Sequence, residues 1–123
     1  MPKKILFIED ESALQRALTQ VLTEEGYQML SALDGEIGLS LARKEMPDLI
    51  LLDIILPRKN GLEVLEELKR DPVTRNIKVV ILSNLEGSED IEHALNAGAT
   101  TYLVKTNYQL DEVVEKVKQI LSE

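Results

Sequence analysis

The segment DLILLDIILPRKNG, residues 48 to 61, decides the fold of this chain. Four apolar residues, Leu49 to Leu52, form a run without alternation, which is typical of a strand buried on both faces. Asp53 follows directly, and Pro57 and Gly61 then indicate a loop. The strand therefore delivers a carboxylate to the point where the chain leaves the core.

Short apolar runs alternate with helical repeats along the whole sequence. The strands predicted from these runs are residues 4–8, 28–32, 48–53, 77–83 and 100–104. Apolar residues at helical spacing after each run predict five helices, with Ile37 and Leu95 among the markers of the second and fourth. Because the strands are apolar throughout, we expect a parallel, doubly wound α/β sheet with helices on both faces.

Several residues predict where the helices begin and end. Ser12 and Gln15 have the spacing of a capping box at the start of the first helix, and Gly26 can stop that helix. Asp34 can cap the second helix.

Composition narrows the class of protein. The chain has 123 residues, 44% of them hydrophobic and 29% charged, which fits one globular domain over residues 1–123. The lack of cysteine excludes disulfides and thiolate metal sites and favours a reducing cytoplasm. A net charge of -8 argues against direct nucleic-acid binding. No stretch approaches the roughly 18 apolar residues of a membrane span, so we expect no membrane insertion.

The carboxyl ends of parallel strands meet at one edge of a sheet, where the ligand site of such folds lies. The polar groups delivered to this edge are Glu9, Asp10, Glu11, Asp53, Ser83, Asn84, Lys105 and Thr106. Each alone also fits a structural role, such as an acidic turn, a cap or a surface lysine. Crowded carboxylates favour a bound cation, and oxygen ligands favour Mg²⁺ or Mn²⁺. His93 lies within a predicted helix and is expected on the surface.

The pattern as a whole resembles the receiver domain of two-component response regulators, in the single-domain form known from chemotaxis. Its marks are the acidic pair after the first strand, D-x-x-x-P-x-x-x-G from Asp53 to Gly61, Ser83 ending the fourth strand and Lys105 ending the fifth. The resemblance covers essentially the whole chain. It implies a flavodoxin-like sheet of five strands in the order 2-1-3-4-5 with five helices.

The resemblance also implies roles for the acidic residues. Asp53 would accept a phosphoryl group from a sensor histidine kinase or a phosphotransfer protein, with Mg²⁺ or Mn²⁺ as the cofactor. Asp10 would bind the metal directly and Glu9 through water, while Asp53 and the main-chain carbonyl of Ile55 complete the protein ligands. Lys105 would neutralise phosphoryl oxygens. Such a protein is a phosphoacceptor that assists its own phosphorylation and dephosphorylation, and is not counted as an enzyme.

The resemblance also implies that phosphorylation causes a conformational change that passes on the signal. By resemblance, Ser83 hydrogen-bonds the new phosphoryl group, and Tyr102 fills the space that Ser83 leaves. The surface of the fourth helix, fifth strand and fifth helix then changes shape and is recognised by an unknown downstream protein.

Two departures from the family pattern carry expectations of their own. Thr106 stands where proline is usual, so we expect a trans Lys105–Thr106 bond, with Thr106 or Asn107 capping the last helix. By resemblance, Ile55 and Leu85 occupy the positions that flank the water attacking the phosphoryl group. These side chains cannot orient a water, which predicts slow loss of phosphate.

Three other functions compete with this reading. A receiver-like module that binds partners without phosphorylation would usually lack one of the key residues, all of which are present. An aspartyl-nucleophile hydrolase needs a second Asp two residues after the first, where Ile55 stands. A flavin-binding protein of this topology needs a first loop rich in Ser, Thr and Gly, whereas this loop is EDES.

Overall fold

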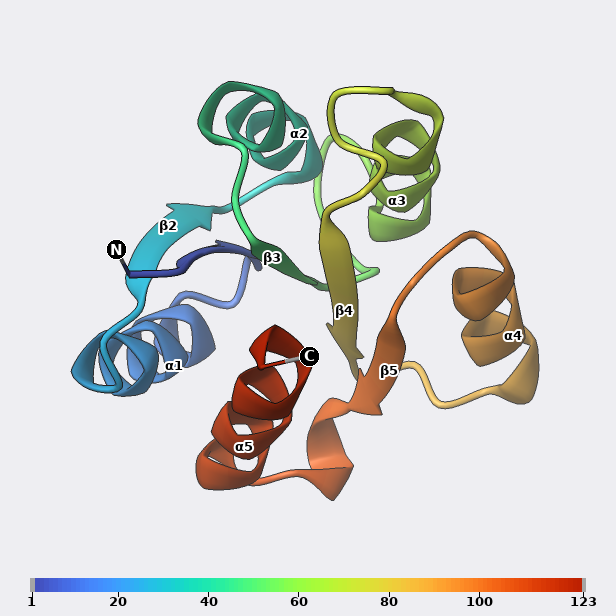
Figure 1. Ribbon diagram of the computed structural model, residues 1–123. Coiled ribbons are helices and arrows are strands. Elements are labelled where there is room, and N and C mark those ends of the chain that lie inside the picture. The colour runs from blue at the N-terminus through green and yellow to red at the C-terminus, as the bar shows by residue number, and fades with distance from the viewer. Residues whose placement is uncertain (1, 123) are drawn as a thin grey trace.

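A computed structural model describes residues 2–122 as a parallel sheet covered by helices on both faces (Figure 1). The strands are β1 (Lys4–Ile8), β2 (Gln28–Ala32), β3 (Leu49–Leu52), β4 (Lys78–Ser83) and β5 (Thr101–Val104). The helices are α1 (Ser12–Glu24), α2 (Gly35–Glu45), α3 (Gly61–Arg70), α4 (Ser88–Asn96) and α5 (Leu110–Leu121). The strand order β2-β1-β3-β4-β5 confirms the predicted flavodoxin-like fold.

The sheet separates two aliphatic cores. Alternate strand residues such as Ile50 and Leu52 pack with α2, α3 and α4, whereas Leu49 and Leu51 pack with α1 and α5. Figure 1 shows α1 and α5 on one side of the sheet and the other three helices on the opposite side. Burial of both faces explains why these strands carry unbroken apolar runs.

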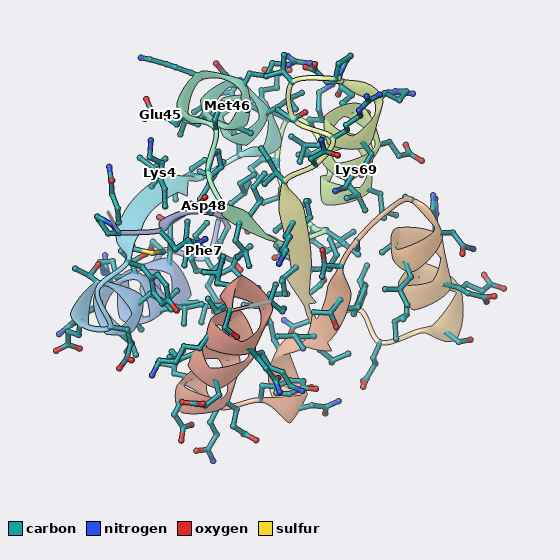
Figure 2. The ribbon with its side chains drawn as sticks, in the orientation of Figure 1. Lys4, Phe7, Glu45, Met46, Asp48 and Lys69 are labelled. Carbon is teal, nitrogen blue, oxygen red and sulfur yellow. The ribbon has the colours of Figure 1, made fainter. Side chains whose placement is uncertain are left out.

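Strand register places the functional groups at one edge. Ile8 pairs with Leu52, and Ser83 pairs with Val104, so the carboxyl ends of neighbouring strands are level. At the opposite edge, where the strands begin, polar side chains pair with the main chain and with one another. There the Lys4 main-chain N–H donates to Asp48 Oδ2 at 2.7 Å, and its ammonium lies 3.4 Å from Glu45 Oε1 (Figure 2). None of the helices in residues 2–122 has the length and apolar character that a membrane crossing requires.

The start of α1 differs from the prediction. Glu11, and not Ser12, is the residue before the first helical turn, and its side chain makes no capping hydrogen bond. Gln15 points inward and donates to strand carbonyls, so the predicted capping box is wrong. The chain does turn at Gly26, whose φ of 98° lies in the left-handed region that glycine tolerates. Asp34 caps α2 as predicted, accepting from the Ile37 N–H at 2.8 Å.

The start of α5 also differs from the prediction, which placed the cap at Thr106 or Asn107. Thr106 and Asn107 lie in a short 3-10 turn, Lys105–Asn107, and therefore do not cap the helix. Gln109 precedes α5, and its N–H donates to the Glu112 carboxylate at 2.9 Å. The Lys105–Thr106 bond is trans, as predicted.

Candidate functional site

Asp53 sits one residue beyond β3, and its side chain is only 7% exposed. The Asp53 N–H donates to the Ile8 carbonyl at 3.1 Å, which ties the residue to the neighbouring strand. Its carboxylate is held from two sides: Oδ1 accepts from the Ile55 N–H at 3.3 Å, and Oδ2 accepts from Lys105 Nζ at 3.0 Å. The end of the apolar strand thus presents a carboxylate with little freedom to rotate.

Lys105 links the carboxylates of two strand ends. Its ammonium lies 2.7 Å from Glu9 Oε1 and 3.0 Å from Asp53 Oδ2, while Glu11 Oε1 is farther away at 3.8 Å. Burial alone would lower the pKa of Lys105, but the adjacent carboxylates of Glu9 and Asp53 outweigh it and raise the pKa. Lys105 therefore stays a cation between the carboxylates of Glu9 and Asp53.

Glu9 is completely buried, which is uncommon for a glutamate. Burial raises the pKa of its carboxyl, and the nearby charge of Asp53 raises it further. Glu9 Oε2 accepts from the Glu11 N–H at 3.0 Å. Although Oε1 is close to Lys105, the contact lacks hydrogen-bond geometry, and Oε1 has no hydrogen-bond partner among the described residues. Lys105 supplies a nearby positive charge, and a divalent cation at this site would give the buried oxygen a further partner.

The donor set fits a hard divalent cation. One carboxylate oxygen each from Glu9, Asp10 and Asp53 lies within 4.8 Å of the others. They border a hollow of about 230 Å³ that is lined by Glu9, Asp10, Glu11, Asp53, Ile55, Asn84 and Lys105. Oxygen ligands and room for water suit Mg²⁺ or Mn²⁺.

Ser83 and Tyr102 meet at the segment that follows β4. Ser83 is fully buried, and its Oγ accepts from the Leu85 N–H at 3.3 Å. The Tyr102 hydroxyl donates to the Leu85 carbonyl at 2.7 Å, and burial raises the pKa of this half-buried side chain. The two predicted switch residues are therefore joined through the main chain of Leu85.

The structure brings Glu9, Asp10, Asp53, Ile55 and Lys105 to the same hollow, as the sequence predicts. Leu85 behaves differently from expectation: its side chain packs against the core, and Asn84 lines the hollow instead. His93 is on the exposed side of α4, 3.4 Å from Glu66.

Two residues near the site, Asn84 and Gln15, have no functional role in the sequence prediction. Asn84 was visible only as the residue after the fourth strand. Gln15 carried a usable signal, because it shares a helical face with Leu18 and Leu22, the other buried residues of α1. A polar residue in such a position needs hydrogen-bond partners inside the protein.

Comparison with known proteins identifies the family. The response regulator receiver domain family matches residues 5–118. The chain is 34% identical to sporulation initiation phosphotransferase F of Bacillus subtilis over 121 residues, which covers 98% of this chain and 95% of that protein. It is 40% identical to the response regulator PleD of Caulobacter vibrioides over 105 residues, which covers 85% of this chain but only 23% of PleD.

Solved structures agree. A CheY-like receiver domain protein from Methanospirillum hungatei superimposes with a TM-score of 0.92 at 30% identity, covering 99% of this chain and 95% of that one. The chain therefore belongs to the response regulator receiver domain family, a class of phosphoacceptor proteins in phosphorelay signalling. The cluster of Glu9, Asp10 and Asp53 fits the phosphorylation site of that class.

Two related structures contain metals of the type that the site favours. Response regulator Rcp1 was solved with Mn²⁺ (TM-score 0.83, 32% identity, 98% of this chain and 93% of that one). A CheX-CheY-BeF3 complex from Borrelia burgdorferi was solved with Mg²⁺ (TM-score 0.89, 26% identity, 98% and 90%).

Proposed function

We propose that this protein accepts a phosphoryl group on Asp53 from a histidine kinase or a phosphotransfer protein, in a reaction that depends on Mg²⁺ or Mn²⁺. The observation that carries the proposal is the position of Asp53. Its carboxylate lies at the end of β3, within 4.8 Å of the oxygens of Glu9 and Asp10 and 3.0 Å from the ammonium of Lys105.

The transfer would use the groups already in place. A carboxylate oxygen of Asp53 attacks the phosphorus of a phosphohistidine in line, the P–N bond breaks, and the imidazole leaves with the bonding electrons and takes up a proton. When bound, a divalent cation would supply positive charge to the phosphoryl oxygens. Glu9, Asp10, Asp53 and the carbonyl of Ile55 would hold it. Lys105, whose ammonium lies 3.0 Å from Asp53 Oδ2, would then pair with a phosphoryl oxygen.

The same geometry supports the proposed switch. A phosphoryl group adds negative charge and strong acceptors next to β4, where the Ser83 hydroxyl can donate to it. Movement of Ser83 would alter the segment at Leu85 to which Tyr102 is hydrogen-bonded. We infer that this changes the surface of α4, β5 and α5, which a downstream protein recognises. Membership of the receiver family supports a cytoplasmic location.

A protein-binding module that works without phosphorylation is the alternative. The complete acidic cluster, with its fully buried Glu9 carboxylate, favours the phosphoacceptor, since a module that binds only partners has no need for this costly arrangement. Incubation with acetyl phosphate, with and without Mg²⁺, separates the two functions by intact mass. We expect one added phosphoryl group only when Mg²⁺ is present. No added mass under either condition would favour the interaction module.

A further inference from the structure

Gln15 is an amide on the core-facing side of α1. It is only 9% exposed and lies in helical phase with Leu18 and Leu22, which are fully buried. A buried amide without partners costs free energy, so its surroundings have to supply hydrogen bonds. The hydrogen-bond partners of the Gln15 amide show which part of the main chain it stabilises.

The Gln15 side chain joins α1 to the ends of two strands. Its Nε2 lies 2.9 Å from the Ala32 carbonyl at the end of β2 and 3.1 Å from the Glu9 carbonyl just after β1. A longer contact of 3.4 Å reaches the Phe7 carbonyl. The two short contacts account for both N–H groups of the amide.

These hydrogen bonds fix the main chain of Glu9 from both sides. The Glu9 N–H donates to the Ala32 carbonyl at 3.0 Å, and the Glu9 carbonyl accepts from Gln15. The Glu9 carboxylate is in turn held by the Glu11 N–H and faces Asp53. Asp10 is the next residue in the chain, so the orientation of its side chain depends on the same main-chain hydrogen bonds of Glu9.

We propose that Gln15 is a positioning residue for the cation site, which acts by holding the Glu9–Asp10 segment with its carboxylates turned toward Asp53. Gln15 does not touch the reacting groups, and it lies outside the set of residues that line the hollow. The proposal rests on the metal site of the proposed function. Outer-shell partners that orient metal ligands typically change metal affinity by about 10- to 100-fold.

Calorimetric titration of the full chain with Mg²⁺ tests the proposal. Gln15→Met keeps the length and helix propensity of the side chain but cannot donate a hydrogen bond. We expect this variant to bind Mg²⁺ about tenfold more weakly than the parent. Thr19→Val is the matched control one turn later on α1, because Thr19 Oγ1 is buried without a hydrogen-bond partner in the described residues. Its Mg²⁺ affinity should equal that of the parent.

The outcomes are distinct. A parent that binds no Mg²⁺ overturns the proposed metal site and this inference with it. If the parent binds Mg²⁺ and Gln15→Met binds it equally well, only the inference is overturned, even when the variant unfolds at a lower denaturant concentration. A purely structural role would produce that lower midpoint and leave the affinity unchanged.

A measurement on the parent chain covers the case in which Gln15→Met does not fold. The side-chain amide protons of Gln15 and of the exposed Gln20, on the same helix, can be followed by NMR during a Mg²⁺ titration. We expect the Gln15 signals to shift with the same midpoint as the Glu11 amide, and those of Gln20 to stay in place. Gln15 signals that respond no more than those of Gln20 would overturn the proposal.

Discussion

The ammonium of Lys105 donates to the carboxylate of Asp53 at 3.0 Å although 52 residues separate the two in sequence. The contact joins the ends of β3 and β5 and balances the charge of the proposed nucleophile while no phosphoryl group is present. Because the same ammonium lies 2.7 Å from Glu9, it also offsets the repulsion between the two buried carboxylates. Phosphorylation would therefore change a contact that connects three strand ends.

The last two residues of the β1–α1 loop, Asp10 and Glu11, should differ in their effect on metal binding. Asp10 contributes an oxygen to the cluster, whereas the Glu11 side chain is 61% exposed and lies outside it. We expect Asp10→Ala to weaken Mg²⁺ binding by more than the roughly tenfold expected for Gln15→Met, because Asp10 would contact the metal itself. Glu11→Ala should cost roughly threefold at most, because salt screens an exposed charge. Equal losses in a calorimetric titration would contradict this geometry.

Glu9 should make the metal-free protein less stable as the pH rises. Because burial raises the pKa of Glu9 in the folded chain above its ordinary value of 4.5, the folded state holds this proton more tightly than the unfolded state. The resulting stabilisation is fully present below the unfolded pKa and is lost as pH rises through the folded pKa. Glu9→Gln lacks this titration, so it should unfold at a higher urea concentration than the parent near neutral pH.

Urea midpoints measured in EDTA from pH 4.5 upward test this expectation. The difference between the parent and Glu9→Gln isolates the contribution of Glu9, since the other groups titrate in both proteins. Parallel pH profiles would show that Glu9 has the same pKa in the folded and unfolded chains.

Ile55 should prolong the life of the phosphorylated form. Its side chain is 59% exposed and lines the hollow, where it offers apolar surface and no hydrogen bond to an attacking water. Leu85 packs toward the core, so Ile55 is the better position to change. We expect Ile55→Asn to speed the loss of phosphate several-fold, a part of the roughly 10²-fold effect of a fully placed proton acceptor.

The measurement is the decay of the phosphorylated protein after removal of the donor, with Mg²⁺ present. Ile55→Leu is the matched control, because it keeps an apolar side chain and should decay at the parent rate. The double variant Ile55→Asn with Leu85→Glu should decay at least as fast as the single change. If Ile55→Asn decays no faster than the parent, the shielding hypothesis is wrong.

Gly61 should tolerate no side chain. A Cβ at this position would lie 2.1 Å from the Asp53 carbonyl oxygen and 2.6 Å from Ile54 Cα, both of them main-chain atoms. Gly61→Ala should therefore lower the free energy of unfolding by about 1–3 kcal/mol or more. At Gly87 a Cβ would meet only Asp90 Oδ2, at 3.2 Å, so Gly87→Ala should cost less than about 1 kcal/mol. Urea unfolding compares the two, and equal midpoints would contradict the prediction.

The sequence predicts the strands and the acidic site for related physical reasons. Strands such as Leu49–Leu52 are buried on both faces, so their apolar runs stand out from the helical repeats. Parallel strands end at one edge of a sheet, so the sequence alone predicts that Asp53 and Lys105 lie together. Apolar residues at helical spacing predict burial less well, since Ile37 and Leu95 are 50% and 45% exposed.

The errors arise where one local pattern has two physical explanations. Gln15 has the spacing of a capping residue, but it also lies on the buried face of α1, and its carbonyl partners come together only in the folded sheet. The cap of α5 was misplaced because the chain first forms the 3-10 turn Lys105–Asn107. Short turns of this kind leave little trace in a hydrophobic pattern.

Whether Asp53 accepts the phosphoryl group is tested by the intact mass of the protein after incubation with acetyl phosphate and Mg²⁺. Asp34→Asn is the matched control, because Asp34 is a buried carboxylate that caps α2 and asparagine caps equally well. We predict one added phosphoryl group on the parent and on Asp34→Asn, and none on Asp53→Asn. An Asp53→Asn variant that gains the phosphoryl group as the parent does would contradict it.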